Sequence, residues 1–237
     1  MPAFYHPDIN QSNIEIELSE TESIHCSKVL RLKAGDEIHI FNGKGGIFNG
    51  KILEQKKKNT IVTVSSQLKE NLKRKFEIHL AIAPTKNAER IEWFVEKAIE
   101  IGIDKISFIL SRYSERKHLR LDRIHKIAVS AMKQSYNPIY PELSELIKFE
   151  DFLDSEIIEA EKFLAYEETT TSHSLIKKAK INSSYCIIVG PEGGFNSEEL
   201  QKAEIAGFEK ISLGPNRLRT ETAGVVACNI LNMIHLI

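Results

Sequence analysis

The spacing of hydrophobic and polar positions changes near residue 70. Before it, apolar and polar residues alternate in short segments at 37–41, 47–55 and 59–66, with the glycine turn "NGKGG" at 42–46. This period of two predicts a small antiparallel β-barrel or sandwich. Residues 22–30 are the exception, because their pattern favours a short helix.

After residue 75 the pattern alternates between strand and helix. Nearly continuous apolar runs predict strands at 76–84, 105–110, 162–168, 185–191 and 210–214. Helical spacing of apolar residues predicts a helix that ends at Gly102 and a second helix around 121–132. Strands that are apolar throughout are typical of a mostly parallel sheet with helices on both faces. We therefore expect an α/β chain with two domains, residues 1–72 and 73–237.

The C-terminal segment of the sequence predicts an apolar helix that begins at Ala223. Its apolar residues surround the helix instead of forming one stripe: Val225, Val226, Cys228, Ile230, Leu231, Met233, Ile234, Leu236 and Ile237. Such a helix must be buried on most sides. A partner subunit would supply the cover, which predicts a homodimer through the C-terminal helix region. Burial inside the core of a monomer is the alternative.

Composition narrows the class of protein. No apolar run approaches the roughly 18 residues that span a bilayer, and no export signal is recognisable at residues 1–10, so we expect a cytoplasmic protein without membrane contact. The three cysteines Cys26, Cys186 and Cys228 are far apart and outside any metal-ligand spacing. They predict buried, reduced thiols and no metal site.

The charge is unevenly distributed although the net charge is only −1. Residues 73–140 carry 14 Lys and Arg against 8 Asp and Glu, whereas residues 141–237 carry 9 against 16. A local excess of cations is what phosphate contacts require, although any one of them is more often a solvated surface charge. Our candidates for contact with RNA are His25, Lys28, Arg31, Lys73, Arg74, Lys75, Lys86, Arg90 and Arg112.

Three predicted strands end in polar or glycine-rich segments, at 166–168, 190–195 and 213–221. Ligands of open α/β sheets bind beyond the carboxyl ends of the strands, so these segments are expected to wall one pocket. In "GPEGGFNSEEL", Gly193 and Gly194 permit a tight turn, and Asn196 with Glu199 predicts a capping box. A plain turn is the alternative to a binding loop.

Glu192 restricts what that loop can bind. The spacing matches neither known phosphate-binding glycine pattern, and a carboxylate would repel an anion. A neutral or cationic ligand is compatible with it. S-adenosylmethionine is one, because its sulfonium is positive and its adenine can bond to exposed backbone groups.

Four segments in order, "HCSKVLRLKAGD", "TKNAERIEWFVEKAIEIG", "GPEGGF" and "LGPNRLRTETA", resemble the RsmE family of bacterial 16S rRNA uridine-N3 methyltransferases of the SPOUT class. The resemblance implies an N-terminal PUA-like β-barrel and a C-terminal SPOUT α/β domain with a trefoil knot. It also implies S-adenosylmethionine as cofactor, 16S rRNA in the 30S ribosomal subunit as partner, and a homodimer.

The resemblance also implies which residues contact the cofactor. They are Leu164, Tyr166, Gly190, Glu192, Gly193, Gly194, Leu213, Gly214, Leu218 and Arg219. The chain departs from the family pattern at Lys133 and Asn137 in "KQSYNP", and at Asn216 and Arg217. These departures concern contacts with RNA more than the reaction.

Methylation of a uracil at N3 requires alignment, loss of the N3 proton and stabilisation of the anion that forms. Arginine suits the last task because it stays charged and offers a planar fork of donors. We expect Arg219 to stabilise charge, Arg217 to hold a phosphate or base edge, and Glu221 to orient groups or accept the proton. Alternatively, Thr220 caps a surface helix and Glu221 complements its dipole, which leaves the two arginines unexplained.

Two other function classes remain open from the sequence. The chain could be a non-catalytic RNA-binding or ribosome-assembly module that retains the fold. It could also be an enzyme that uses a different nucleotide cofactor, although it has no phosphate-loop lysine and no dinucleotide-binding fingerprint.

Overall fold

The computed structural model describes residues 1–12, 14–56, 58–70, 74–155, 157–167 and 173–236. The chain forms two compact units. The N-terminal unit is Met1–Lys73 with Val129–Tyr140, and the C-terminal unit is Arg74–Ala128 with Pro141–Ile237. Nothing in the sequence pattern indicated that Val129–Tyr140 groups with the N-terminal residues.

The N-terminal unit contains a five-stranded sheet of order β1-β3-β4-β5-β2. Its strands are β1 (Ala3–Tyr5), β2 (Glu15–Leu18), β3 (Glu37–Phe41), β4 (Gly46–Gln55) and β5 (Thr60–Glu70). The last three confirm the predicted strands. The sheet is mixed, not purely antiparallel as expected, because β1 pairs with β3 in parallel. Register shifts between β4 and β5 mark β-bulges, which bend a strand and increase its twist.

The predicted short helix is present as α1 (Glu20–Ile24), continued by the π-helix η1 (His25–Val29). The hydroxyl of Ser19 accepts a hydrogen bond from the amide of Glu22 and so caps α1. Glu22 is buried and forms an ion pair of 2.7 Å with Lys133, whose side chain is 16% exposed. Lys133 is therefore used inside the N-terminal unit and is not available to RNA.

The C-terminal unit contains a six-stranded sheet in which every pair is parallel. Its order is β11-β9-β10-β6-β7-β8, with β6 (Glu77–Ile82), β7 (Lys105–Leu110), β8 (Glu142–Lys148), β9 (Glu161–Ala165), β10 (Ser184–Val189) and β11 (Glu209–Ile211). This confirms the predicted α/β class with a parallel sheet. Strand β8 was missed because it is a half-exposed edge strand without a continuous apolar run.

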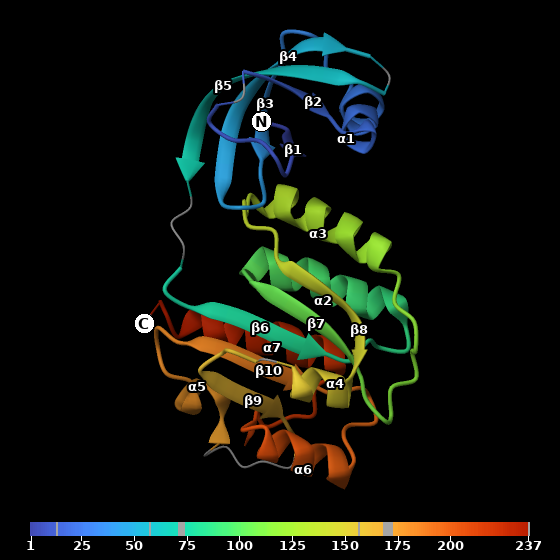
Figure 1. The fold of residues 1–237 in the computed structure, drawn as a ribbon, viewed down its shortest axis with the longest axis vertical. Helices are drawn as coiled ribbons and strands as arrows, with labels where there is room; N and C mark the ends of the chain where they lie inside the picture. Colours follow the sequence, from blue (N-terminus) through green and yellow to red (C-terminus); the bar gives the residue numbers. More distant parts are fainter. Residues whose placement is uncertain (13, 57, 71–73, 156, 168–172, 237) are drawn as a thin grey trace. The chain divides into compact units, whose positions relative to one another are not determined.

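Helices cover both faces of this sheet (Figure 1). On one face, α7 (Thr220–Met233) packs against α2 (Ala88–Ile101), β6 and β10. On the other face, aromatic and small side chains of α4 (Phe149–Asp154) and α6 (Ser197–Ile205) join the core formed by β6, β9 and β10. The remaining helices are α3 (Leu121–Ser135), whose residues are divided between the two units, and α5 (Leu175–Lys178).

Within this chain α7 is buried on one side only. Ala223, Ala227, Cys228 and Leu231 are buried against the sheet and α2, whereas Met233 is 46% exposed. The alternative, burial on most sides inside the core of a monomer, is therefore not met by the described residues, and cover by a partner subunit stays a prediction.

The three cysteines are free and buried, as expected. Burial raises the pKa of Cys228 to about 12, so the thiol stays protonated. Among the described residues, no helix is both long enough and apolar enough to cross a membrane.

Candidate functional site

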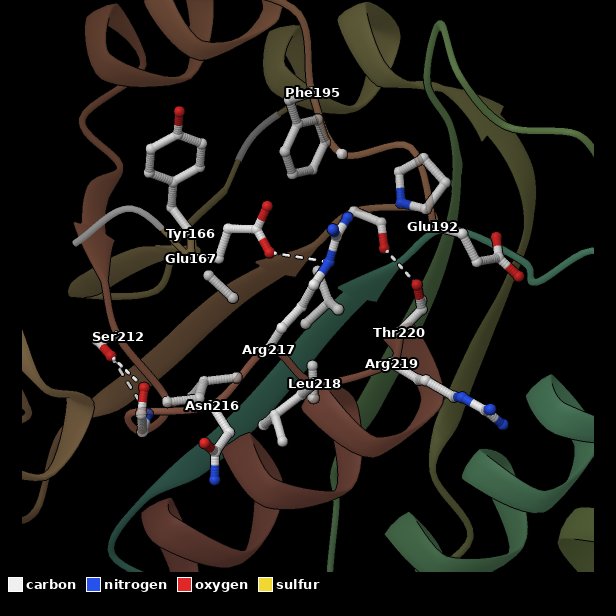
Figure 2. Close-up of a pocket in the computed structure, with 18 of the residues that line it drawn as sticks. Tyr166, Glu167, Glu192, Phe195, Ser212, Asn216, Arg217, Leu218, Arg219 and Thr220 are labelled. Carbon is white, nitrogen blue, oxygen red and sulfur yellow. Dashed lines mark hydrogen bonds and ion pairs between the residues drawn. The ribbon is translucent and has the colours of Figure 1, made fainter.

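A cavity of about 730 Å³ lies at the carboxyl ends of β9 and β10 (Figure 2). Three loops supply most of its walls: residues 165–167 after β9, 190–195 after β10, and 212–220 between β11 and α7. These are the three strand ends that the sequence analysis assigned to one pocket. Its volume is within the range of small-molecule sites in proteins.

The loop after β10 is a tight turn that leads into a capped helix. The amide of Gly194 donates to the carbonyl of Pro191 at 2.9 Å, and Gly194 has φ of +69°, which disfavours residues with a Cβ. The side chain of Asn196 accepts from the amide of Glu199, and the carboxylate of Glu199 accepts from the amide of Asn196. The predicted capping box is therefore confirmed.

Gly190 and Thr220 join two of the loops. The hydroxyl of Thr220 donates to the carbonyl of Gly190 at 2.9 Å. A Cβ on Gly190 would lie 2.7 Å from the ring of Phe195, so the chain passes close to that ring. Thr220 is thus used to fix the cavity and does not cap α7, whose N-cap residue is Arg219.

Glu192 lies at the edge of the cavity, with its carboxylate directed away from Tyr166 and Arg217 (Figure 2). Its Oε1 accepts from the amide of Lys86 at 3.1 Å. The side chain of Lys86 is exposed and pairs with Glu115 at 2.8 Å, which raises the pKa of Lys86. The carboxylate at the loop therefore also holds the segment that follows β6.

Arg217 and Arg219 point in different directions (Figure 2). The Nε of Arg217 lies 3.0 Å from Oε2 of Glu167, and both side chains are more than half exposed. Such an exposed ion pair contributes about 0–1 kcal/mol, so Arg217 can exchange this partner for a ligand at little cost. Arg219 is exposed and has no partner among the described residues, which leaves its guanidinium available to a reacting group.

Glu221 is not part of the cavity wall. Its side chain is 8% exposed, and its Oε1 lies 3.7 Å from Nε of Arg90 on α2. Its Oε2 is buried without a hydrogen-bond partner in the described part of the chain. Arg90, which we had assigned to RNA, therefore faces a buried carboxylate beside the cavity.

Most predicted cofactor residues line the cavity. They are Tyr166, Gly190, Glu192, Gly193, Gly194, Leu213, Gly214, Leu218 and Arg219. Leu164 does not, because its side chain is buried in the core with Ile188, and the wall begins one residue later at Ala165. Sequence reasoning missed Ala165 and Ser212, which directly precede two of the predicted wall segments, and did not name Glu167, Phe195 and Thr220 within those segments as cofactor contacts. All of these lie in or beside the quoted segments, so their position in the loops was the available signal.

The described residues predicted to bind RNA divide into exposed and half-buried groups. Lys28, Arg31, Lys75, Lys86 and Arg112 are exposed, whereas His25 is half-buried. Arg112 also donates its backbone amide to Glu199, which leaves the guanidinium unaffected. Lys73 lies outside the described residues.

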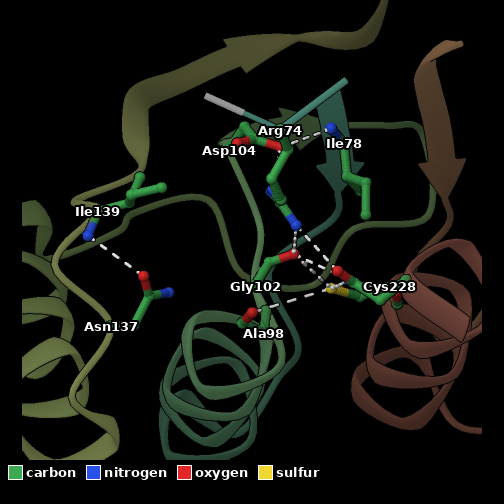
Figure 3. Close-up of polar contacts among 9 residues, drawn as sticks. Arg74, Ile78, Ala98, Gly102, Asp104, Asn137, Ile139 and Cys228 are labelled. Carbon is green, nitrogen blue, oxygen red and sulfur yellow. Dashed lines mark hydrogen bonds and ion pairs between the residues drawn. The ribbon is translucent and has the colours of Figure 1, made fainter. Parts of the chain in front are cut away.

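Arg74 is used inside the C-terminal unit (Figure 3). Its guanidinium donates to the carbonyl of Gly102 at 3.1 Å and to Oδ1 of Asn232 at 2.8 Å, and it also pairs with Asp104. Asp104 accepts in turn from the amide of Ile78. This network ties the end of α2 to α7. Contrary to our prediction, the guanidinium of Arg74 is therefore not available to RNA.

Asn137, one of the departures from the family pattern, makes a local contact in the N-terminal unit. Its Oδ1 accepts a hydrogen bond of 3.2 Å from the amide of Ile139 (Figure 3). The amide side chain therefore shapes the turn after α3.

One buried group combines residue types that bind metals. Donor atoms of His79, Glu159 and Cys186 lie within 4.8 Å of one another. The two ring nitrogens of His79 are hydrogen-bonded to Glu159 at 2.6 Å and to Ser107 at 2.8 Å. Burial raises the pKa of Cys186 well above its ordinary value, so its thiol stays protonated. These contacts make the group part of the core.

Comparison with known proteins identifies the family. The model of an RNA methyltransferase domain matches residues 72–232, and that of an RNA methyltransferase PUA domain matches residues 18–65. A ribosomal RNA small subunit methyltransferase E from Rickettsia conorii is 33% identical over 217 residues, which are 91% of this chain and 88% of the relative. The chain belongs to the ribosomal RNA small subunit methyltransferase E (RsmE) family. The resemblance stated from the sequence is confirmed.

Solved structures agree with membership of the RsmE family. A probable rRNA-methyltransferase from Porphyromonas gingivalis matches with a TM-score of 0.87 and 36% identity, covering 100% of this chain and 99% of that one. An RsmE protein from Neisseria gonorrhoeae bound to S-adenosyl methionine matches with a TM-score of 0.84 and 26% identity, covering 96% and 95%. The agreement covers both units of the chain.

Proposed function

We propose that this chain uses S-adenosylmethionine to methylate N3 of one uridine in the 16S rRNA of the small ribosomal subunit. The observation that carries the proposal is that the three loops wall one and the same cavity, in a chain of the RsmE family. An rRNA substrate in turn implies a cytoplasmic location.

The cavity suits S-adenosylmethionine by its chemistry. Glu167 and Glu192 provide carboxylates for a cationic ligand, and Leu213 and Leu218 provide apolar surface for an adenine ring. Gly193 is exposed and Gly194 is half-buried, so backbone groups of the glycine turn can be reached by a ligand. The bound cofactor would supply an electrophilic methyl group on sulfur.

The arginine loop would supply the chemistry at the uracil. Arg219 is exposed and unpaired among the described residues, so it can stabilise the negative charge that spreads onto the uracil carbonyl oxygens as N3 loses its proton. Arg217 would leave Glu167 to hold a phosphate or base edge. Glu221, whose buried carboxylate lies outside the cavity wall, would orient Arg90 and the start of α7.

The finer features of the fold belong to the same proposal. We assign residues 1–72 to a PUA-like RNA-binding barrel and residues 73–237 to a SPOUT domain with a trefoil knot. The course of the chain supports a knot: β11 lies at the sheet edge beside β9, yet α7 returns to pack on β6 and β10. The segment between them, 212–219, runs beside the loops after β9 and β10.

A homodimer through the C-terminal helix region is supported by the apolar side of α7 that this chain leaves open. Val225, Val226 and Ile230 are half-buried, and Met233 and Leu236 are exposed. A second copy would cover this surface by a symmetric contact.

The exposed cations support binding of RNA. Lys28 and Arg31 follow α1 in the N-terminal unit, and Lys86 and Arg112 follow β6 and β7 in the C-terminal unit. We propose that these residues, with Lys73 and Lys75, contact rRNA phosphates.

Transfer of a labelled methyl group from S-adenosylmethionine tests the function, with 30S subunits or free 16S rRNA from cells that lack the protein as substrate. The expected product is one N3-methyluridine, located by mass spectrometry. A chain that binds the RNA but transfers no methyl group to either substrate would be a non-catalytic RNA-binding module.

A further inference from the structure

A second cavity, of about 330 Å³, lies in the C-terminal unit and shares no wall residue with the first. It is formed by the first turns of α2, the loop between β7 and α3, and the first turn of α3. Of its apolar wall residues Leu119 is half-buried, whereas Ile91 and Ile124 are buried. His118 and Arg120 are exposed at its rim. Nothing in the proposed cofactor site uses it.

The charges around this cavity differ in availability. Arg123 is neutralised by Glu92, with Nε 2.6 Å from Oε1 and a second nitrogen 2.7 Å from Oε2. Arg116 donates to the carbonyls of Thr85 and Lys86. Arg120 is 77% exposed, and its contact with Asp122, at 3.6 Å, is long and solvated. Arg120 and the exposed His118 are therefore the cationic and donor groups that a ligand can engage, with Glu89 as the remaining acid of the wall.

The two cavities are connected by one loop. The amide of Lys86 donates to Glu192 in the first cavity, and the carbonyl of Lys86 accepts from Arg116 in the second. Asn87, the next residue, lines the second cavity and caps α2 by accepting from the amide of Glu89 at 3.0 Å. An RNA strand that places one base in the first cavity therefore passes the loop that also borders the second cavity.

We propose that the second cavity binds one nucleotide of the substrate RNA near the methylated uridine. Its base would rest on the half-buried Leu119, and its phosphate would contact Arg120 and His118. Single-stranded RNA is commonly recognised through unstacked bases on aromatic side chains or guanidinium planes, together with cations along the backbone. In this cavity the aliphatic Leu119 would take the place of the aromatic surface. The inference rests on the proposed function, because it takes RNA as the substrate.

Binding of a short uridine-rich single-stranded RNA, measured by fluorescence anisotropy at several salt concentrations, tests the rim. The double variant His118→Ala with Arg120→Ala is expected to bind on the order of tenfold more weakly, and its salt slope should fall by about 1. Lys177→Ala is the matched control, since Lys177 is an exposed cation on α5 outside both cavities. It should bind as the wild type does.

The variant Ala88→Phe tests the cavity apart from its charge. Ala88 is the first residue of α2 and lines the cavity, so a phenyl ring there would occupy the space for the base. RNA binding should weaken while the salt slope stays unchanged. The thermal shift caused by S-adenosylhomocysteine should match that of the wild type in every variant, which also checks that each variant folds.

Wild-type RNA affinity in both the double variant and Ala88→Phe would overturn the inference, as would a wild-type protein that does not bind the oligonucleotide. Polyglutamate as a competitor distinguishes a cavity that binds RNA from one that binds an acidic protein. If it displaces the RNA from the wild type and itself loses affinity in the double variant, the cavity recognises an acidic protein instead. Wild-type RNA binding without methyl transfer would contradict the proposed function and leave this site standing.

Discussion

The hydroxyl of Thr220 donates a hydrogen bond of 2.9 Å to the carbonyl of Gly190, 30 residues earlier in the chain. This contact joins the glycine turn after β10 to the arginine-bearing loop before α7. The cavity depends on that connection because each loop alone supplies only part of the wall. The first turn of α7 is thereby fixed to the sheet, with Arg219 immediately before it.

Replacement of this hydroxyl should loosen the cavity. In Thr220→Val the shape of the side chain is kept, but the carbonyl of the half-buried Gly190 loses its donor. We expect the free energy of unfolding to fall by about 1 kcal/mol and the affinity for S-adenosylhomocysteine to fall several-fold. Urea unfolding and calorimetric titration measure the two effects. Thr222→Val on the same helix is the control, and equal effects from both substitutions would contradict a specific role for Thr220.

Arg219 should matter more for turnover than for cofactor binding. Because its guanidinium has no described partner, its removal costs the folded state little. Loss of a charge-stabilising donor lowers kcat by about 100- to 1,000-fold in comparable sites, so Arg219→Ala should do the same. Methyl transfer under saturating cofactor and a parallel titration of S-adenosylhomocysteine separate the effects. Arg217→Ala should act mainly on KM for RNA, and a fully active Arg219→Ala would refute the assignment.

Variants of Arg74 and of its neighbours Lys73 and Lys75 should distinguish an effect on stability from an effect on RNA binding. Removing the guanidinium in Arg74→Ala leaves Asp104 with only the amide of Ile78 and removes the donor to Oδ1 of Asn232, which should lower the free energy of unfolding by about 2 kcal/mol. The salt slope of RNA binding should stay unchanged. The double variant Lys73→Ala with Lys75→Ala, which retains Arg74, should instead flatten the salt slope without loss of stability. An unchanged slope would remove these lysines from the interface.

The stability of the C-terminal unit should depend on the charge of His235. Its ring stacks on Phe76 with centroids 3.7 Å apart, and burial together with the nearby Arg74 lowers the pKa of His235. The unfolded chain therefore binds a proton more readily than the folded one. The contribution of uncharged His235 to the free energy of unfolding is complete above the pKa of about 6.5 that the residue has in the unfolded chain. It is lost as the pH falls below that value.

Unfolding of His235→Phe, compared with the wild type between pH 8 and about 5, measures this contribution. The variant keeps a ring that can stack but has no proton to bind, so its stability should fall less steeply on acidification. His125→Gln on α3 is the control. Parallel curves for His235→Phe and the wild type would exclude the stacked histidine as a source of the pH dependence.

The open side of α7 should control the oligomeric state. Introducing a charge with Met233→Asp should convert the proposed dimer to a monomer, because a buried unpaired carboxylate is costly at an apolar interface. Light scattering after size-exclusion chromatography reports the mass. Ile205→Asp is the matched control, since Ile205 is an exposed apolar residue on α6. A wild-type mass equal to one chain would contradict the dimer.

Several features of the candidate site follow from local sequence. The glycines at 193–194 and the pair Asn196 and Glu199 predict the turn and the capping box because their effects act within a few residues. Apolar runs such as 105–110 predict buried parallel strands for the same reason. Since ligands bind beyond the carboxyl ends of such strands, the three wall loops were also predictable.

The partners of long polar side chains were not predictable. Arg74 contacts Asn232, 158 residues away, and Glu221 faces Arg90. In both cases the residues adjacent in sequence do not indicate the contact. A charged residue at a loop or helix end satisfies the same local pattern whether it binds a phosphate or another side chain. The sequence by itself determined the class of fold, the turns and the place of the cavity, because these depend on backbone conformation and burial along short segments. Only the tertiary structure decided which charges are committed to the protein and which remain free for a ligand, because that choice depends on distances between segments far apart in the chain.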